Sequence, residues 1–307
     1  MNRVLMADFQ LSLIDPMRIP LLTTFLILVL LGAGALWVLG SALIRVEPRA
    51  VTLDVALGAE PLTLDGGPGQ RVAASFIPAQ ETGKGGGKGG ILLLHGIHSD
   101  RRQMEARAAF LHREGYAVML IDLPGQGAST APAVTFGLTE SEGVRAALEE
   151  LQRRLPGQRI GVIGVSLGAA SLVLCRDCPK VDAAVLESMY PSIEEAVGDR
   201  LRIRLGALGA PLSRLLLWQL PLRLDIQPAQ LRPIARVGAL GMPLLIAAGS
   251  ADRHTTLAET ERLYAAAAAP KSLWVVDGAA HVDLHGYATA EYERRVGAFL
   301  ERYVAGH

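Results

Sequence analysis

The chain has 307 residues and a mass of 32.6 kDa, which is enough for one large domain or two modest ones. Hydrophobic residues make up 50% of the sequence and charged residues 20%, a balance that excludes an intrinsically disordered chain. The numbers of basic and acidic residues are equal, 30 each, so we expect no binding of nucleic acid. Two cysteines are too few for a disulfide framework or a four-thiolate metal site.

A long uncharged segment lies near the N-terminus. From Leu21 to Ile44, 24 consecutive residues carry no charge, and as a helix they would span ~36 Å, more than the ~30 Å hydrocarbon core of a bilayer. The segment is too long for the apolar core of a cleaved signal peptide. It is also apolar on every face, unlike most buried core helices of soluble domains. We therefore expect residues 1–20 to form an N-terminal segment and residues 21–45 an uncleaved, single-pass transmembrane anchor.

The orientation of this anchor is not indicated by its flanking charges. Arg3 and Arg18 precede the segment, and Arg45 and Arg49 follow it, so the positive-inside rule gives a near tie. The sequence predicts a membrane protein without specifying which face of the membrane carries the remaining residues, 46–307.

Short apolar strands alternate with helices beyond the anchor. Predicted strands lie at residues 51–57, 72–76, 91–94, 117–121, 160–165, 183–186, 244–248 and 272–276, and predicted helices at 103–114, 142–155, 167–175, 256–269 and 289–303. This alternation is typical of a mostly parallel sheet covered by helices on both faces. It stops between residues 187 and 241, which we interpret as an insertion at one edge of the sheet. Residues 81–90 form a glycine-rich, low-complexity loop.

A candidate nucleophile follows the predicted strand at 160–165. Gly164-Val165-Ser166-Leu167-Gly168 matches G-x-S-x-G between a strand and a helix. A nucleophile on such a sharp turn tolerates no bulk two residues away, which accounts for Gly164 and Gly168. The turn would raise the hydroxyl of Ser166 above the sheet and direct the backbone N–H of Leu167 at a developing oxyanion. By itself the motif is also compatible with a small-residue turn that only packs a helix against a strand.

Serine needs a neighbouring base, and His281 is the best placed of the seven histidines. It follows a predicted strand end and a small-residue loop, so its imidazole would lie at the C-terminal rim of the sheet, where Ser166 also emerges. His254 shares a loop with a candidate acid and precedes the next helix, and we expect it to be less well placed.

Two carboxylates compete to orient this base. Asp252 comes just past the strand at 244–248, and Glu187 ends the strand at 183–186. We prefer Asp252, because the order Ser166, Asp252, His281 is the one found in hydrolases that carry the G-x-S-x-G turn. Asp283 is interpreted as a solvated residue at a helix start.

The second oxyanion donor is expected in the loop after the strand at 91–94. The backbone N–H of Ile97 is the candidate, and His95 is interpreted as a structural hydrogen-bonding residue. Cys175 and Cys178 are interpreted as small residues at a helix end, with a reversible disulfide as the alternative. No metal site is expected.

These motifs together resemble those of the α/β-hydrolase superfamily. They are LLLHGIHSDRRQM (92–104), IDLPGQGAS (121–129), GVIGVSLGAA (161–170), AAGSADRHT (247–255) and DGAAHVDL (277–284). The likeness covers residues 51–303 and is greatest to membrane-anchored proteins of the serine-aminopeptidase-like branch. It implies the α/β-hydrolase fold, with helices on both faces of a mostly parallel sheet and a short helical lid at about residues 188–241. One departure is PGQG at 124–127, where relatives often carry RGHG.

The resemblance also implies site roles. Ser166 would be the nucleophile, Asp252 the acid and His281 the base, with the N–H groups of Ile97 and Leu167 as oxyanion donors and no cofactor. We expect hydrolysis of a carboxylic ester or thioester of a small substrate with an apolar acyl group. A peptidase or amidase, and a non-catalytic membrane-tethered binding protein, are the alternatives.

Overall fold

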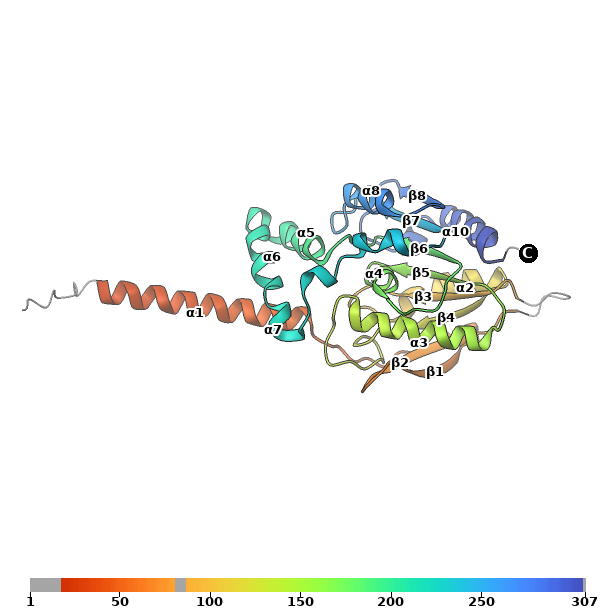
Figure 1. Ribbon diagram of the computed structural model, residues 1–307, viewed down its shortest axis with the longest axis horizontal. Coiled ribbons are helices and arrows are strands. Elements are labelled where there is room, and N and C mark those ends of the chain that lie inside the picture. Colours follow the sequence, from red (N-terminus) through yellow and green to blue (C-terminus); the bar gives the residue numbers. More distant parts are fainter. Residues whose placement is uncertain (1–17, 81–86, 306–307) are drawn as a thin grey trace, which may run out of the picture.

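The computed structural model describes residues 18–80 and 87–305 and contains a long N-terminal helix followed by an α/β domain (Figure 1). Residues 1–17 of the expected N-terminal segment and residues 81–86 of the glycine-rich loop lie outside the described residues.

An eight-stranded sheet forms the centre of the domain, with the order β1-β2-β4-β3-β5-β6-β7-β8. The strands are β1 (Glu60–Asp65), β2 (Arg71–Ile77), β3 (Gly90–Leu94), β4 (Ala117–Ile121), β5 (Ile160–Val165), β6 (Ala183–Glu187), β7 (Leu244–Gly249) and β8 (Lys271–Val276). The pairs β1–β2 and β2–β4 are antiparallel, and all other neighbours are parallel. The mostly parallel sheet is therefore confirmed.

Helices cover both faces of this sheet. The α-helices are α1 (Arg18–Leu43), α2 (Glu105–Arg113), α3 (Leu138–Arg154), α4 (Leu167–Leu174), α5 (Ile193–Leu205), α6 (Gly209–Leu217), α7 (Leu220–Leu224), α8 (Leu257–Ala266), α9 (Leu284–Tyr287) and α10 (Thr289–Tyr303). The 3-10 helices are η1 (Val55–Leu57), η3 (Arg101–Met104), η4 (Gly206–Leu208), η5 (Pro228–Gln230), η6 (Pro233–Ala235) and η7 (Val237–Ala239).

The central strands alternate their side chains between two apolar layers. Leu92 and Leu94 of β3 belong to the layer that contains residues of α3, α4 and α8. Ile91 and Leu93 belong to the opposite layer, with residues of α2 and α10. All residues of β3 to β7 are buried, which explains why these strands are continuous apolar runs in the sequence.

The first predicted strand, at residues 51–57, is wrong. Its second half forms η1, because the Asp54 side chain accepts a hydrogen bond from the N–H of Ala56 and caps a helical turn. Gly58 then adopts a left-handed φ of 57° and ends the turn. The edge strand is instead β1, which pairs only with β2.

For the two cysteines, the structure supports the alternative interpretation, a disulfide, over that of small helix-end residues alone. Cys175 and Cys178 form a disulfide. The chain turns after α4 ends at Leu174 and brings their Cα atoms to 5.6 Å, a separation that a disulfide spans.

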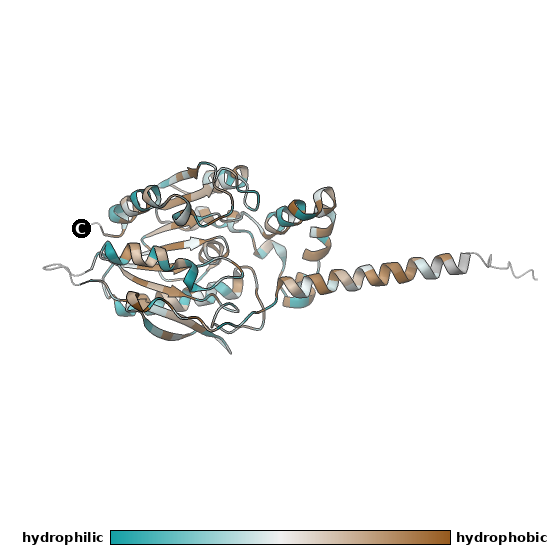
Figure 2. Ribbon diagram, turned by 180° about the vertical axis from the view of Figure 1, so that it is seen from behind, coloured by the Kyte–Doolittle hydropathy of each residue, from teal (hydrophilic) through white to brown (hydrophobic). Residues whose placement is uncertain are grey.

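The helix α1 extends away from the domain and is hydrophobic along most of its length (Figure 2). Its apolar side chains are exposed. The part from Thr23 to Leu43 is long and apolar enough to cross a membrane. Its C-terminal end lies beside α6 and α7, which belong to the insertion between β6 and β7 (Figure 1). This insertion, with α5 to α7, is the helical element expected at about residues 188–241.

Candidate active site

Ser166 lies on a sharp turn between β5 and α4. Its φ of 50° is in the left-handed region, which is strained for a residue with a side chain. A Cβ atom at Gly164 would lie 2.6 Å from the backbone nitrogen of Ala169, and one at Gly168 would lie 2.5 Å from the carbonyl oxygen of Leu94. Only glycine fits at these two positions, so the steric reason for the motif is present in the structure.

His281 and Asp252 form a hydrogen-bonded pair. The Nδ1 atom of His281 lies 2.7 Å from Oδ2 of Asp252. The other carboxylate oxygen accepts the backbone N–H groups of His254 and Thr255, at 2.8 and 2.9 Å. Because this ionised carboxylate can only accept hydrogen bonds, Nδ1 carries the imidazole proton and Nε2 is left as the basic nitrogen of the neutral ring.

The electrostatic state of Asp252 suits this arrangement. Burial acts to raise the pKa of its carboxyl group, but the hydrogen bond from His281, together with the two backbone N–H groups, holds that pKa below its usual value. The carboxylate is therefore ionised at neutral pH and can stabilise an imidazolium ion.

Ser166 and His281 line one cavity of about 210 Å³ at the C-terminal ends of the strands. Gly96 and Ile97, from the loop after β3, line the same cavity. Leu167 is the first residue of α4, and an N–H at that position has no partner within its own helix. The arrangement brings a hydroxyl, an oriented imidazole and candidate oxyanion donors to one place.

Hydrogen bonds hold the loop that carries Ile97. The side-chain oxygen Oε1 of Gln103 accepts the N–H of Gly96 at 2.8 Å. The Nε2 atom of His95 accepts the N–H of Leu123 at 3.0 Å, so its Nδ1 donates to the carbonyl oxygen of Gly96 at 2.7 Å. Burial lowers the pKa of His95. This neutral imidazole joins the loop to the end of β4, as expected for a structural residue.

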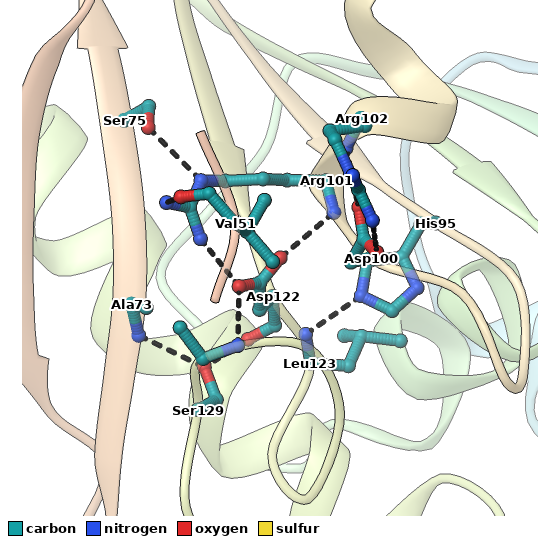
Figure 3. A network of polar contacts seen from close by, with 11 residues as sticks. Val51, Ala73, Ser75, His95, Asp100, Arg101, Arg102, Asp122, Leu123 and Ser129 are labelled. Atoms are coloured by element: carbon teal, nitrogen blue, oxygen red, sulfur yellow. Dashed lines mark hydrogen bonds and ion pairs between the residues drawn. The ribbon is translucent and has the colours of Figure 1, made fainter. Parts of the chain in front are cut away.

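Asp122, just past β4, is the centre of the polar network that supports this loop (Figure 3). Its carboxylate accepts the backbone N–H of Arg101 at 2.7 Å and that of Ala128 at 2.8 Å, and it also pairs with the guanidinium of Arg101. The hydroxyl of Ser129 donates to the Asp122 carbonyl oxygen at 2.6 Å. A Cβ atom at Gly127 would collide with the Asp122 carboxylate, so the second glycine of PGQG is needed for this packing.

Glu187, the competing acid, lies in a different network. Its carboxylate pairs with Nη2 of Arg107 at 2.6 Å and accepts the hydroxyl of Tyr292 at 2.5 Å. Arg107 also forms an ion pair with Asp283, at 2.7 Å. Asp283 caps α9 through its carboxylate, so it is a helix-start residue as predicted, but its pairing with the buried Arg107 means that it is not simply solvated. The structure thus brings Asp252, and not Glu187, to His281.

The cavity wall contains further polar residues that the sequence did not assign to the site. These residues are Gln103, Ser188, Arg200, His254 and Asp283. The ring centroid of His254 is 5.3 Å from that of His281, and its position two residues after Asp252 was a usable signal. Arg200 comes from α5 in the insertion, and nothing in the sequence indicates which insertion residue faces the site. Within residues 18–80 and 87–305, no cluster of three or more His, Cys, Asp or Glu side chains could hold a metal ion.

The fold and motifs match known proteins. Rv2307c of Mycobacterium tuberculosis, an uncharacterized protein, is 32% identical over 224 residues, which are 70% of this chain and 69% of the relative. The Pyrococcus furiosus esterase PF2001 superposes with a TM-score of 0.68 at 21% identity and covers 85% of this chain and 98% of its own.

A peptidase has the same fold. The acylaminoacyl peptidase of Pyrococcus horikoshii superposes with a TM-score of 0.60 at 15% identity, over 81% of this chain and 42% of its own. Residues 91–295 match the model of the alpha/beta hydrolase family. This chain belongs to that family, as its motifs predicted.

Proposed function

We propose that this protein is a serine hydrolase that cleaves a carboxylic ester or thioester through an acyl-Ser166 intermediate. One observation carries the proposal: Ser166 lines the same cavity as His281, whose Nδ1 is hydrogen-bonded to Asp252. The similarity in fold to an esterase and to a peptidase supports hydrolase activity in general.

The proposed reaction has two halves. In the first, Nε2 of His281 takes the proton of the Ser166 hydroxyl while Oγ attacks the acyl carbon. The N–H groups of Leu167 and Ile97 stabilise the tetrahedral oxyanion, with about 3 kcal/mol for each donor. Collapse breaks the bond to the leaving alkoxide or thiolate, which receives the proton from His281.

In the second half, water hydrolyses the acyl-enzyme. His281 takes a proton from the water, and the hydroxide attacks the acyl carbon of the Ser166 ester. Collapse of the second tetrahedral intermediate releases a carboxylic acid and returns the proton to Oγ of Ser166. Asp252 keeps its negative charge throughout and stabilises the imidazolium form of His281.

The same groups could hydrolyse an amide, and a non-catalytic binding protein could use the cavity without any chemistry. Labelling with a neutral fluorophosphonate probe separates the enzyme from the binding protein. We expect the full-length, detergent-solubilised protein to be labelled and Ser166→Ala to remain unlabelled. Ser141→Ala is the matched control, because the buried Ser141 hydroxyl bonds only within α3. A folded wild-type protein that is not labelled would overturn the proposal.

Hydrolysis rates on p-nitrophenyl esters of increasing acyl length, measured beside rates on aminoacyl anilides, compare ester with amide cleavage.

We also propose that α1 anchors the protein in a membrane as a single span. The exposed apolar side chains along α1 support this attachment. The insertion lies against the domain end of the helix, where the guanidinium of Arg223 is 3.7 Å from the Trp37 ring centre and donates to Ser41 at 2.9 Å. Leu215, Trp218 and Leu222 of the insertion are exposed near this contact.

Alkaline carbonate extraction of cell membranes tests the anchor. We expect the full-length chain to stay in the membrane pellet, because alkaline carbonate releases proteins held by electrostatic contacts but does not release an apolar span. Recovery of the folded protein in the supernatant would contradict a transmembrane anchor.

A further inference from the structure

We propose that Arg200 makes the catalytic cavity an anion-binding site, so that the preferred substrate carries a carboxylate or phosphate close to the bond that is cleaved. The inference rests on the proposed hydrolase activity of the same cavity. It differs from the expectation of a purely apolar acyl group, because it assigns a charged group to the substrate.

The first observation is the position of Arg200. It projects from α5 of the insertion into the cavity lined by Ser166 and His281. Its Nη1 donates a hydrogen bond of 2.9 Å to the carbonyl oxygen of Ala196, one turn earlier in the same helix. This bond uses few of the donors of a guanidinium, and it ties α5 to no other element. The contact therefore does not explain why a cation lies in the cavity.

The second observation is that the charge of Arg200 is not neutralised by an ion pair within the described parts of the chain. Asp199, its neighbour, pairs with Arg202 at 2.5 Å. Asp252 directs its carboxylate oxygens to His281 and to two backbone N–H groups. Burial lowers the pKa of Arg200, and Tyr190 and these two aspartates only partly oppose that effect. A desolvated cation without a paired carboxylate favours an incoming anion.

The third observation concerns the groups beside Arg200. Ser188 and His254 line the same cavity, and each has a buried polar atom, Oγ and Nδ1 respectively, without a hydrogen-bond partner in the described structure. Burial, and then the charge of Arg200, lower the pKa of His254, so its imidazole is neutral at pH 7. Asp283 also lines the cavity, and its carboxylate is engaged by Arg107 and by the N-terminus of α9. The cavity wall thus combines the Arg200 cation, which has no ion pair among the described residues, with neutral polar groups that have unused hydrogen-bonding capacity.

The size of the cavity limits the ligand. Its volume of about 210 Å³ is below the ~300–1,000 Å³ typical of sites for drug-sized ligands. Arginine binds carboxylate and phosphate groups through paired N–H donors. The anion would therefore be a small carboxylate or phosphate group of the substrate, held near the carbonyl that Ser166 attacks.

Matched substrates test the proposal on the full-length protein in detergent. The carboxylate series compares p-nitrophenyl hemiesters of dicarboxylic acids with their methyl-capped, neutral counterparts. The phosphate series compares acyl esters of glycerol phosphate with the same acyl esters of glycerol. We expect a roughly 10- to 100-fold higher kcat/KM for the anionic member of at least one series, and the series that shows it identifies the anion.

Variants of residues on α5 test whether the preference for anionic substrates comes from the Arg200 side chain. Arg200→Ala should lose it, because kcat/KM should fall much further for the anionic ester than for its neutral counterpart, and Arg200→Lys should keep part of it. Arg204→Ala is the matched control, because Arg204 is exposed on the same helix and its removal changes the net charge equally. The proposal is overturned if the wild type shows no preference in either series, or if the preference survives in Arg200→Ala.

A measurement without catalysis keeps this proposal separate from the proposed function. In the Ser166→Ala background, glutarate or inorganic phosphate should raise the Tm, and adding Arg200→Ala should abolish that rise. No rise with either anion would overturn the anion site even if fluorophosphonate labels Ser166. A rise in a wild type that fluorophosphonate does not label would support the anion site and overturn the hydrolase.

Discussion

The imidazole of His281 and the carboxylate of Asp252 come from loops after neighbouring parallel strands, β8 and β7, and meet at 2.7 Å. The pair depends on the turn after β7, whose two backbone N–H groups hold the second oxygen of Asp252. The backbone at the end of β7 therefore helps to fix the orientation of the His281 ring, together with the two side chains.

Replacement of Asp252 by Asn tests the role of this pair in catalysis. The amide can donate a hydrogen bond to Nδ1, which would move the imidazole proton to Nε2 and remove the base that faces Ser166. We expect kcat to fall by roughly 10⁴-fold with the fold retained. Steady-state hydrolysis of a p-nitrophenyl ester measures the change, with circular dichroism as the control for folding. A decrease of less than tenfold would argue against Asp252 as the orienting acid.

The same variant predicts a pH dependence of stability. The folded-state pKa of Asp252 lies below the usual value of 3.8, so the ionised carboxylate adds stability above the unfolded-state pKa and loses that contribution as the pH falls through the folded-state pKa. The difference in free energy of unfolding between wild type and Asp252→Asn should shrink as the pH falls below about 4. Urea unfolding across this range measures it. A difference that grows on acidification would contradict the direction of the pKa shift.

Glu187→Gln distinguishes the two candidate acids. The substitution leaves the buried Arg107 without its closest carboxylate, and we expect a loss of roughly 3–5 kcal/mol in the free energy of unfolding. Because Glu187 does not contact His281, the activity per folded molecule should stay within about tenfold of wild type. Thermal unfolding and active-site titration with a fluorophosphonate measure the two effects. If catalysis is lost in a protein that remains folded, the acid has been assigned to the wrong residue.

Gly168→Ala tests the packing of the nucleophile turn. The added Cβ would press on the carbonyl oxygens of Leu94 and His95, so we expect loss of fluorophosphonate labelling and a lower Tm. Gly198→Ala is the control, because a Cβ there meets no atom within 4 Å and Gly198 lies in the interior of α5. That substitution should stabilise the protein by about 0.5–1 kcal/mol. Equal effects of the two substitutions would argue against the steric explanation.

Arg223→Ala tests the contact between the insertion and α1. The variant loses the stacking on Trp37 and the hydrogen bond to Ser41, so backbone amides of α6 and α7 should exchange hydrogen faster in detergent micelles. The exposed Arg214 of α6 has the same charge, and Arg214→Ala should leave the exchange rates unchanged. Mass spectrometry of peptides from residues 209–224 provides the measurement. Unchanged exchange in Arg223→Ala would mean that the contact does not hold the insertion.

The sequence predicts the sharp turn at Ser166 and the central strands because their signals are local. The strands β4 and β5 have the predicted bounds, since strands buried on both faces are continuous apolar runs. Gly164 and Gly168 are needed because other backbone atoms lie very close to them, and both positions are within a few residues of Ser166. Such features need no knowledge of distant parts of the chain.

Other features depend on packing that the sequence pattern does not record. The edge strand β1 pairs on one side only, and most of its residues are exposed or half-buried, so its hydrophobic signal is weak. The predicted helix at 142–155 begins earlier, at Leu138, because the buried carboxylate of Glu140 accepts the N–H groups of Thr135 and Gly137. Arg200 reaches the cavity only because the insertion folds back over the strand ends.

The insertion carries Arg200 at one end and rests on α1 at the other, through Gln219 and Arg223. A version of this protein shortened to remove α1 for easier purification would leave that second end without its support. Kinetic constants and inhibitor screens obtained on such a shortened version would describe an altered entrance to the cavity. The full-length chain, in detergent or lipid, is therefore the appropriate material for assigning a substrate.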